Sequence, residues 1–244
     1  MVKHYHEHMS RTAVRGRRVA FFGGSFDPPH RGHLAVARAA RAALKLDEVL
    51  FAPVGAQPLK PQGSTASFSD RLEMTRLAIA GEPGFSLSLA DAPVAGHLPN
   101  YTIDTLERLH AQLRSDSTLF CLMGADSFLG LRRWYRGAEL PFAAPLIVAS
   151  RPGQLLGDLA AVLPEGLSID AESAPAAGED FRSYTLRNAS GATTPFYLLP
   201  GLHVEISASQ IRLQVHAALG RLPGGHELLS DTVCEYIAAH RLYR

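Results

Sequence analysis

One short stretch near the start of the chain gathers residue types that handle phosphate. It contains the glycine pair Gly23 and Gly24, then Ser25, and after a short gap the two histidines His30 and His33. Glycines let the main chain approach a phosphate closely, and a serine hydroxyl donates a hydrogen bond to it. Histidines three positions apart at a helix start face one side of the helix. The stretch therefore predicts a site where both imidazoles meet a charged phosphorus centre.

The residues on either side must form the elements that position this stretch. Residues 18–22 are a short apolar run of the kind found in buried parallel strands, and residues 34–44 are strong helix formers at helical spacing. A helix that opens near Gly32 turns free N–H groups and its positive dipole end toward the turn. Such strand-to-helix junctions are where open α/β sheets bind ligands. If the glycine pair or the histidine pair stood alone, a glycine turn with a structural histidine would be the alternative explanation.

The full string resembles a known signature. Residues 23–33 read Gly-Gly-Ser-Phe-Asp-Pro-Pro-His-Arg-Gly-His. This is similar to the Gly-Gly-[Ser/Thr]-Phe-Asp-Pro-x-His-x-Gly-His signature of the nucleotidyltransferase superfamily. The resemblance implies a Rossmann-like fold in which the two histidines contact ATP phosphates and are catalytic. The ATP contacts that it implies here are Gly23, Gly24, Ser25, Phe26, His30 and His33.

Composition limits the classes of protein. The chain has 244 residues, of which 46% are hydrophobic, and a formal net charge of +1 at pH 7. This length fits one large α/β domain with a sizeable core, and the near-neutral charge predicts no nucleic-acid partner. No apolar run reaches membrane-spanning length and no cleavable leader is recognised, so we expect no membrane partner. Cys121 and Cys234 lie in apolar and helical patterns, as small core residues do, which predicts a reduced, cytoplasmic setting.

Residues 1–18 are polar and basic, which predicts a flexible extension. His4, His6 and His8 alternate there, but no acidic or cysteine partners at recognisable ligand spacing accompany them. We therefore predict no metal site formed by the protein itself.

A loop after the second predicted strand carries a candidate cation. Residues 47–53 form that strand, and Lys60 follows it between two prolines. Loops at this end of a parallel strand commonly hold functional residues. Lys60 matches the lysine of the family's Pro-Pro-His-Lys segment, although Leu59 stands where histidine is usual. The resemblance implies a catalytic Lys60, and a surface lysine without a task is the alternative.

A segment in the middle of the chain resembles the pocket of one branch of the superfamily. Asn100, Tyr101 and Thr102 precede a predicted helix over residues 103–113, which Thr102 can cap. They are similar to the Ser-Tyr-Thr-x-x-Thr-Leu segment of nicotinate-nucleotide adenylyltransferases, which forms part of the pyridine-nucleotide pocket. Asn100 replaces the usual serine and Pro93 the usual acidic residue. The resemblance implies that Asn100, Tyr101 and Thr102 bind nicotinate mononucleotide.

Trp134 is the only tryptophan of the chain. A buried core indole is the ordinary interpretation of such a residue. The family places a tryptophan here against the pyridine ring, where a flat apolar surface stacks well. The resemblance therefore adds Trp134 to the residues that bind the mononucleotide.

Two further predicted strands end in residues of the family's adenosine site. Residues 118–123 lead into Gly124 and Asp126, and residues 145–149 lead toward Arg151. In the family a Gly-x-Asp-Ser at the first position holds the adenosine side of ATP, and a carboxylate accepts hydrogen bonds from ribose hydroxyls. A helix N-cap without a ligand is the alternative for Asp126. The resemblance implies ATP contacts from Gly124, Asp126 and Arg151.

A second phosphate motif lies near the C-terminal end. Ser207 and Gln210 form a capping-box pattern that opens a helix running to Gly220. The segment is similar to the superfamily motif Ile-Ser-x-[Ser/Thr]-x-Ile-Arg, which grips the β- and γ-phosphates of ATP. Capping explains Ser207 but leaves Arg212 without a role. The resemblance implies ATP contacts from Ser207, Ser209 and Arg212, with Arg212 catalytic.

These patterns define a fold and a domain plan. We expect an α/β protein with a Rossmann-like, doubly wound, mostly parallel sheet and a C-terminal helical appendage. The flexible extension covers residues 1–18 and the nucleotidyltransferase domain covers residues 19–244. Within that domain, residues 154–192 are expected to be a loop excursion and residues 207–244 the helical part.

The resemblance implies an activity. A nicotinate-nucleotide adenylyltransferase combines ATP, carried with Mg²⁺, and nicotinate mononucleotide to give nicotinate adenine dinucleotide and pyrophosphate. The Asp27 carboxylate is expected to order the turn rather than act as a base, because the attacking phosphate is already ionised. The alternatives are an adenylyltransferase for another acceptor, such as phosphopantetheine, and a nucleotide sensor without activity. The sequence leaves the oligomeric state open, and a homo-oligomer is compatible with it.

Overall fold

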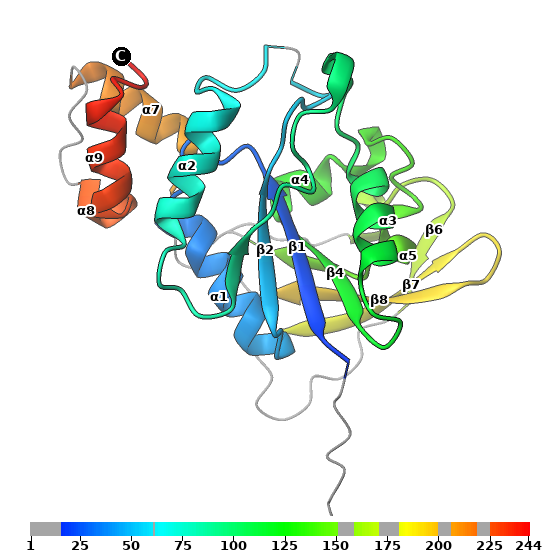
Figure 1. The fold of residues 1–244 in the computed structure, drawn as a ribbon. Helices are drawn as coiled ribbons and strands as arrows, with labels where there is room; N and C mark the ends of the chain where they lie inside the picture. Colours follow the sequence, from blue (N-terminus) through cyan, green and yellow to red (C-terminus); the bar gives the residue numbers. More distant parts are fainter. Residues whose placement is uncertain (1–15, 61, 151–158, 171–180, 200–205, 219–224) are drawn as a thin grey trace, which may run out of the picture.

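The computed structural model describes residues 16–60, 62–150, 159–170, 181–199, 206–218 and 225–244. These residues form one sheet of eight strands in the order β3-β2-β1-β4-β5-β8-β7-β6 (Figure 1). The strands are β1 (Arg18–Gly24), β2 (Glu48–Pro53), β3 (Phe85–Leu87), β4 (Thr118–Gly124), β5 (Leu146–Ala149), β6 (Leu167–Ile169), β7 (Arg182–Asn188) and β8 (Thr193–Leu199).

Most of the sheet is parallel. Strands β3, β2, β1, β4, β5 and β8 run in the same direction, whereas β7 is antiparallel to β8 and β6 is antiparallel to β7. Gly24 pairs with Pro53 and Gly124 pairs with Ala149, so the carboxyl ends of four strands share one edge. The order of the strands reverses between β1 and β4, and ligands bind at such a switch point in open α/β sheets.

Helices cover both faces of this sheet (Figure 1). The longer ones are α1 (Arg31–Leu44), α2 (Phe68–Ala78), α3 (Thr102–Gln112), α7 (Ala208–Ala217) and α9 (Asp231–Ala239). Short turns of helix are α4 (Ala125–Leu129), α5 (Leu140–Ala143), α6 (Leu159–Val162), α8 (Gly225–Leu228), η1 (Ala95–His97) and η2 (Leu131–Arg133). The doubly wound, mostly parallel α/β fold expected from the sequence is confirmed.

The alternation of β1 explains the two layers. Val19 and Phe21 enter the core shared with α3 and α5, while Ala20 and Phe22 enter the core shared with α1. Burying a phenylalanine side chain stabilises a fold by about 1.5–3 kcal/mol. A strand buried on both faces is therefore held firmly, and the turn at its carboxyl end starts from a fixed place.

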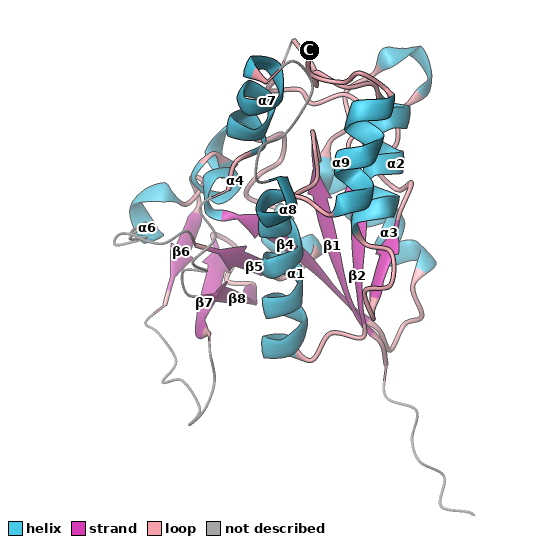
Figure 2. Cartoon of the chain, turned by 90° about the vertical axis from the view of Figure 1, so that its left-hand side faces the viewer, coloured by secondary structure: helices cyan, strands magenta, loops and turns pink. Residues whose placement is uncertain are grey.

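The C-terminal helices form a third core of their own against α2. Met74 of α2, Ile211 and Val215 of α7, and Val233 and Ile237 of α9 are all buried in it. Figures 1 and 2 both show α9 beside α2. The helical appendage thus packs on the helix that follows the Lys60 loop, near the carboxyl edge of the sheet.

The expected loop excursion at residues 154–192 is in part regular. The structure places α6, β6 and β7 within it, so the prediction was wrong for these segments. Only Leu186 of β7 is fully buried, because β7 lies toward one edge of the sheet and leaves most of its polar side chains partly exposed. Its alternation is therefore too weak to read from sequence. Residues 154–158 and 171–180 lie outside the described residues.

Within the described part of the chain, no helix is both long and apolar enough to cross a membrane. Residues 1–15 of the predicted extension lie outside the described residues, and the first strand begins at Arg18.

Candidate active site

The turn after β1 leads directly into α1 and brings the two histidines together. His30 occupies the N-cap position of α1, and His33 lies in its first turn. Their rings are stacked, with centroids 3.7 Å apart and an interplanar angle of 26°. The His30 main-chain N–H donates to His33 Nδ1 over 3.1 Å. A neutral His33 ring therefore carries its proton on Nε2, which makes that atom a hydrogen-bond donor.

The glycine pair is constrained by packing as well as by any ligand. A Cβ atom on Gly23 would lie 2.7 Å from the ring of Phe21, and one on Gly24 would lie 3.3 Å from the ring of Phe26. Packing is therefore a second reason for glycine at position 23, which sequence analysis missed. Only a hydrogen atom leaves room there for the ring of Phe21. A side chain at either position would have to displace an aromatic ring.

The Ser25 hydroxyl accepts hydrogen bonds from two side chains of the loop after β2. Gln57 Nε2 and Lys60 Nζ donate to Ser25 Oγ over 2.9 Å and 3.0 Å. Partial burial and the charges of Arg212 and Arg71 lower the pKa of Lys60, while the charge of Asp27 opposes this. Lys60 therefore lies within the candidate site, in a positively charged setting.

Arg71 is a site residue that sequence analysis missed. It lies in α2, has only 2% of its surface exposed, and donates to Ser25 O over 2.7 Å and to Val54 O over 2.8 Å. Its burial lowers its pKa, opposed by the charge of Asp27. The available signal was its position on the buried stripe with Met74 and Ala78. An arginine at such a position needs polar partners, and these partners are the two loops of the site.

Arg212 reaches the same turn from α7. Its Nη1 donates to Asp27 O over 2.7 Å, and its Nη2 donates to Ser209 Oγ over 3.1 Å. Ser207 caps α7 by accepting from Gln210 N over 3.2 Å, as the capping-box pattern predicts. A hollow of about 390 Å³ lies beside Arg212 and is lined by Thr65, Ser209, Arg212, Leu213, His216, Tyr243 and Arg244.

Three cations from three elements therefore meet one turn. Lys60 from the loop after β2, Arg71 from α2 and Arg212 from α7 each donate to Ser25 or Asp27. Asp27 has a structural role, because its carboxylate accepts hydrogen bonds from the main-chain N–H groups of Thr65 and Ala66. The arrangement suits a polyanion next to two imidazoles.

The residues expected to hold the acceptor, all of which the structure describes, include no such group of cations. Asn100 is 5% exposed, its Oδ1 accepts from Ala56 N over 2.9 Å, and its Nδ2 donates to Ala92 O over 2.8 Å. Both ends of its amide are thus bonded within the protein. Helix α3 begins at Thr102 itself with Tyr101 at the N-cap position and no side-chain cap, so the expected capping by Thr102 was wrong.

An aromatic contact links this segment to the chain after η2. The rings of Tyr101 and Tyr135 lie with centroids 4.5 Å apart. Trp134, next to Tyr135, is partly buried and packs against the core that contains α3 and α5. The structure thus brings the neighbourhood of Trp134 to the start of α3.

The adenosine-side residues lie at the end of β4. Gly124 is its last residue and takes the N-cap position of α4, while Asp126 lies exposed in the first turn. Asp126 is therefore not the N-cap of this helix, which removes the capping alternative. Arg151 lies outside the described residues.

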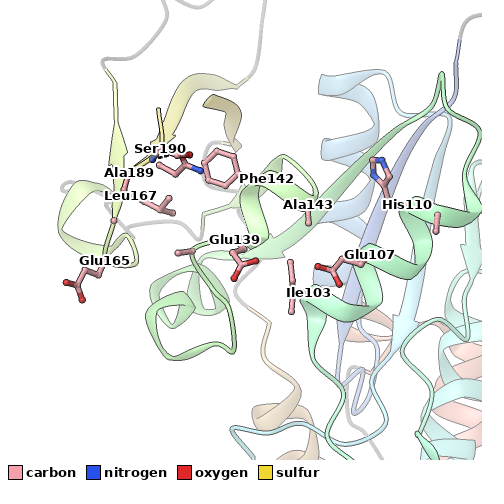
Figure 3. Close-up of a pocket in the computed structure, with 14 residues that line it drawn as sticks. Ile103, Glu107, His110, Glu139, Phe142, Ala143, Glu165, Leu167, Ala189 and Ser190 are labelled. Carbon is pink, nitrogen blue, oxygen red and sulfur yellow. Dashed lines mark hydrogen bonds between the residues drawn. The ribbon is translucent and has the colours of Figure 1, made fainter. Parts of the chain in front are cut away.

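A larger hollow than the one beside Arg212 lies elsewhere. A groove of about 740 Å³ runs between α3, α5 and the turns that flank β6 and β7 (Figure 3). Its lining includes Ile103, Glu107, His110, Phe142 and Leu167. Among the described residues, none of the predicted site residues lines this groove, so it is separate from the candidate site.

Comparison with known proteins defines the class first. The family model described as cytidylyltransferase-like matches residues 21–214, which include both phosphate motifs. A probable nicotinate-nucleotide adenylyltransferase from Gloeobacter violaceus is 40% identical over 228 residues, 93% of this chain and 97% of that protein. One from Laribacter hongkongensis is 38% identical over 93% of this chain and 94% of that protein. The chain belongs to the nicotinate-nucleotide adenylyltransferase family of cytidylyltransferase-like proteins.

Solved structures agree on the fold. Plasmodium falciparum nicotinic acid mononucleotide adenylyltransferase complexed with NaAD matches with a TM-score of 0.66 at 15% identity, covering 93% of this chain and 97% of that chain. A structure described as that of a putative nicotinate-nucleotide adenylyltransferase from Vibrio parahaemolyticus matches with a TM-score of 0.57 at 16% identity, over 93% of this chain and 96% of that chain.

Proposed function

We propose that this chain transfers the adenylyl group of ATP to nicotinate mononucleotide, giving nicotinate adenine dinucleotide and pyrophosphate in NAD biosynthesis. The relatives that are 37–40% identical over 93% of the chain carry that activity in their names. The observation that carries the proposal for the site is the meeting of Lys60, Arg71 and Arg212 on the turn that leads to the stacked histidines.

The reaction needs no nucleophile from the protein. A phosphate oxygen of the mononucleotide attacks the α-phosphorus of ATP in line, the bond from this phosphorus to the bridging oxygen breaks, and pyrophosphate leaves with the electron pair. The site then has to align the two phosphates and stabilise the charge on the transferred and leaving groups. No proton has to be removed, because the attacking phosphate is already ionised.

The residues divide this task by position. His30 and His33, with the Gly23 and Gly24 main chain, contact the phosphates at the start of α1, where the helix dipole also favours anions. Lys60 and Arg212 neutralise the developing charge of the leaving pyrophosphate. The ATP-contacting residues that we propose are Gly23, Gly24, Ser25, Phe26, His30, His33, Gly124, Asp126, Arg151, Ser207, Ser209 and Arg212.

The acceptor binds at the start of α3 in this proposal. Asn100, Tyr101, Thr102 and Trp134 form its surroundings, with the indole against the pyridine ring. Free N–H groups at the helix start suit the nicotinate carboxylate. Because the Asn100 amide is bonded to Ala56 and Ala92, it shapes this pocket rather than contacting the ring.

Magnesium enters as part of the nucleotide substrate. In the described residues, no group of three or more His, Cys, Asp or Glu side chains is placed to hold a metal ion. The side chains at the turn are mainly cations, and the Asp27 carboxylate is already used by main-chain donors. These residues do not fit a metal held by the protein, whereas Mg²⁺ prefers oxygen ligands such as those of the triphosphate.

We also propose a cytoplasmic location, no nucleic-acid or membrane partner, and a chain that can form homo-oligomers. The cellular setting follows from the substrates, which are metabolites, and from the unpaired cysteines Cys121 and Cys234.

The decisive experiment measures pyrophosphate release from ATP and Mg²⁺ with separate acceptors. Nicotinate mononucleotide is expected to support turnover, while phosphopantetheine and a reaction without acceptor serve as comparisons. Turnover only with phosphopantetheine would move the chain to another adenylyltransferase activity. Nucleotide binding without any turnover would favour the sensor.

A further inference from the structure

The end of the chain returns to the turn that follows β1. Tyr243, the second residue from the C-terminus, donates its hydroxyl proton to Asp27 Oδ1 over 2.7 Å, although the two residues are 216 positions apart. Both side chains are buried, with 4% of Asp27 and 8% of Tyr243 exposed. Burial and the charge of Asp27 raise the pKa of the Tyr243 hydroxyl, so this group stays protonated. The contact is a charge-assisted hydrogen bond shielded from water.

Asp27 is the centre of a junction between distant segments. Its Oδ2 accepts from Thr65 N over 2.6 Å, and its Oδ1 accepts from Ala66 N over 3.1 Å in addition to the tyrosine hydroxyl. Its main-chain oxygen accepts from Arg212 Nη1 over 2.7 Å, and this nitrogen lies 4.0 Å from Asp27 Oδ2. One residue thus joins the loop before α2, the guanidinium of α7 and the end of the chain.

The turn around Asp27 is one that needs support from outside. Phe26 has a φ of 47°, in the left-handed region that is unfavourable for residues other than glycine. Its ring meets His33 edge-on, with centroids 5.0 Å apart. A shift of this turn is therefore passed on to a histidine of the site.

The chain after α9 is shaped to bring Tyr243 to Asp27. Arg241 and Tyr243 also have positive φ values, 53° and 62°, and Leu242 N donates to Ile237 O over 3.1 Å. The tyrosine ring packs in the core that α2, α7 and α9 share. A ring that served only this packing would not need its hydroxyl directed at a buried carboxylate.

We propose that Tyr243 is a positioning residue of the adenylyl-transfer site and acts through Asp27 on the Arg212 guanidinium. The inference rests on the proposed function. The tyrosine hydroxyl donates to the Asp27 carboxylate, and Arg212 donates to the main-chain oxygen of Asp27 instead. The guanidinium charge therefore stays available to phosphate oxygens. Without that hydroxyl, the buried carboxylate keeps only the Thr65 and Ala66 N–H donors and draws Nη1 from the long ion pair at 4.0 Å into a hydrogen-bonded one. The guanidinium then turns away from the triphosphate.

The test compares two tyrosines of the same C-terminal helical part. Tyr243→Phe keeps the ring and removes only the hydroxyl. Tyr236→Phe is the matched control, because Tyr236 also donates to an aspartate, Asp70 Oδ1 over 3.0 Å, in the first turn of α2. We expect Tyr243→Phe to lower kcat by about tenfold or more, since a small displacement of a positioned group costs up to about 10²-fold. The KM for nicotinate mononucleotide and the rate of Tyr236→Phe should stay within about twofold of the original protein.

A thermodynamic cycle separates positioning from packing. In the Asp27→Asn background there is no carboxylate to attract Arg212, so adding Tyr243→Phe should lower kcat by no more than about twofold. Equal losses in both backgrounds, or equal losses for the two tyrosine variants, would overturn the inference. If Tyr243→Phe unfolds at the assay temperature, the rates of both tyrosine variants are compared at a lower temperature at which circular dichroism shows that both are folded, and Tyr243→Phe must still be the slower of the two by about tenfold or more.

A binding measurement keeps the inference apart from the proposed function. Calorimetric titration with a non-hydrolysable ATP analogue and Mg²⁺ reports on Arg212 without any acceptor. Tyr243→Phe should weaken this binding by about threefold or more, whereas Tyr236→Phe should leave it unchanged. If the original protein gave no product with nicotinate mononucleotide, the proposed function would fail and this titration would still decide the role of Tyr243.

Discussion

The two ends of the candidate site are built in different ways. At the phosphate end, Lys60, Arg71 and Arg212 are already bonded to one turn, through Ser25 and Asp27. At the acceptor end, one aromatic ring lies at the surface. Tyr135, whose ring contacts that of Tyr101, is 54% exposed, and the polar groups of Asn100 are bonded inside the protein.

This difference indicates which end of the site serves the chemical step and which end selects the acceptor. Arg71 and Arg212 are each held by two hydrogen bonds. In the proposed reaction such cations need little reorganisation when charge develops in the transition state. An exposed ring and helix N–H groups recognise a ligand that reaches them. Substitutions at the phosphate end should therefore lower kcat, and those at the acceptor end should change the KM for the mononucleotide or the choice of acceptor.

The largest effect is expected from His33→Ala. In the proposed mechanism the imidazole stabilises charge that grows in the transition state, so kcat should fall by about 10²–10³-fold, while the KM for nicotinate mononucleotide changes by no more than about threefold. Steady-state kinetics at saturating ATP measure both constants. His110→Ala is the control, because that histidine lies exposed on α3 in the separate groove (Figure 3). An increase in KM with kcat preserved would place His33 in ground-state binding alone.

Lys60 gives the phosphate end a pH dependence. Its pKa is lowered by partial burial and neighbouring arginines, so the free enzyme loses this positive charge below the ordinary titration range of lysine. The value of kcat/KM for ATP should therefore fall at alkaline pH, by up to about tenfold when the cation is lost. Lys60→Arg should keep the cation and move this decline to higher pH, because a guanidinium stays protonated throughout the pH range in which lysine titrates.

The measurement is kcat/KM for ATP from neutral pH to about pH 10, since this quantity reports on ionisations of the free enzyme. Lys45→Arg supplies the control, as Lys45 follows α1 at its far end from the turn. Identical alkaline limbs for the original protein and Lys60→Arg would remove Lys60 from this role.

The acceptor end is expected to favour nicotinate over nicotinamide mononucleotide. Main-chain N–H groups at the start of α3 suit a carboxylate, and an unpaired buried group usually costs about 1–3 kcal/mol, so the preference in kcat/KM should be at least about tenfold. Both mononucleotides are compared at saturating ATP. Equal values, or a preference for the amide, would contradict the assignment of the acceptor while leaving adenylyl transfer in place.

The sequence predicts the residues of the phosphate end better than it predicts the distant residues that hold this turn in place. A strand, a turn and a helix in succession place Gly24, His30 and His33 by local rules alone. The contacts of Arg71 and Tyr243 with this turn depend on how α2 and the chain end pack, which no local pattern encodes. The distance of 216 positions between Tyr243 and Asp27 shows how far such support can come from.

Edge elements are the other part that sequence analysis missed. Strand β7 buries only Leu186, so its polar residues predict a loop, and its place in the sheet depends on pairing with β8. On the acceptor side, the family resemblance alone assigns Asn100 to the mononucleotide. Its burial and the two partners of its amide are tertiary facts that no local pattern encodes.

The smallest effect on function is expected from Asn100→Ser, which restores the residue usual in the family. The serine hydroxyl can replace only one of the two bonds that the amide makes, to Ala56 N and to Ala92 O. The free energy of unfolding should fall by about 1–2 kcal/mol, because one buried main-chain group loses its partner. The preference for nicotinate should change by less than about threefold, since the N–H groups of α3 remain. Thermal unfolding and paired acceptor assays measure the two quantities separately. A change in preference beyond about tenfold with stability unaltered would show that Asn100 contacts the ring, and the two ends of the site would then be built more alike than their contacts indicate.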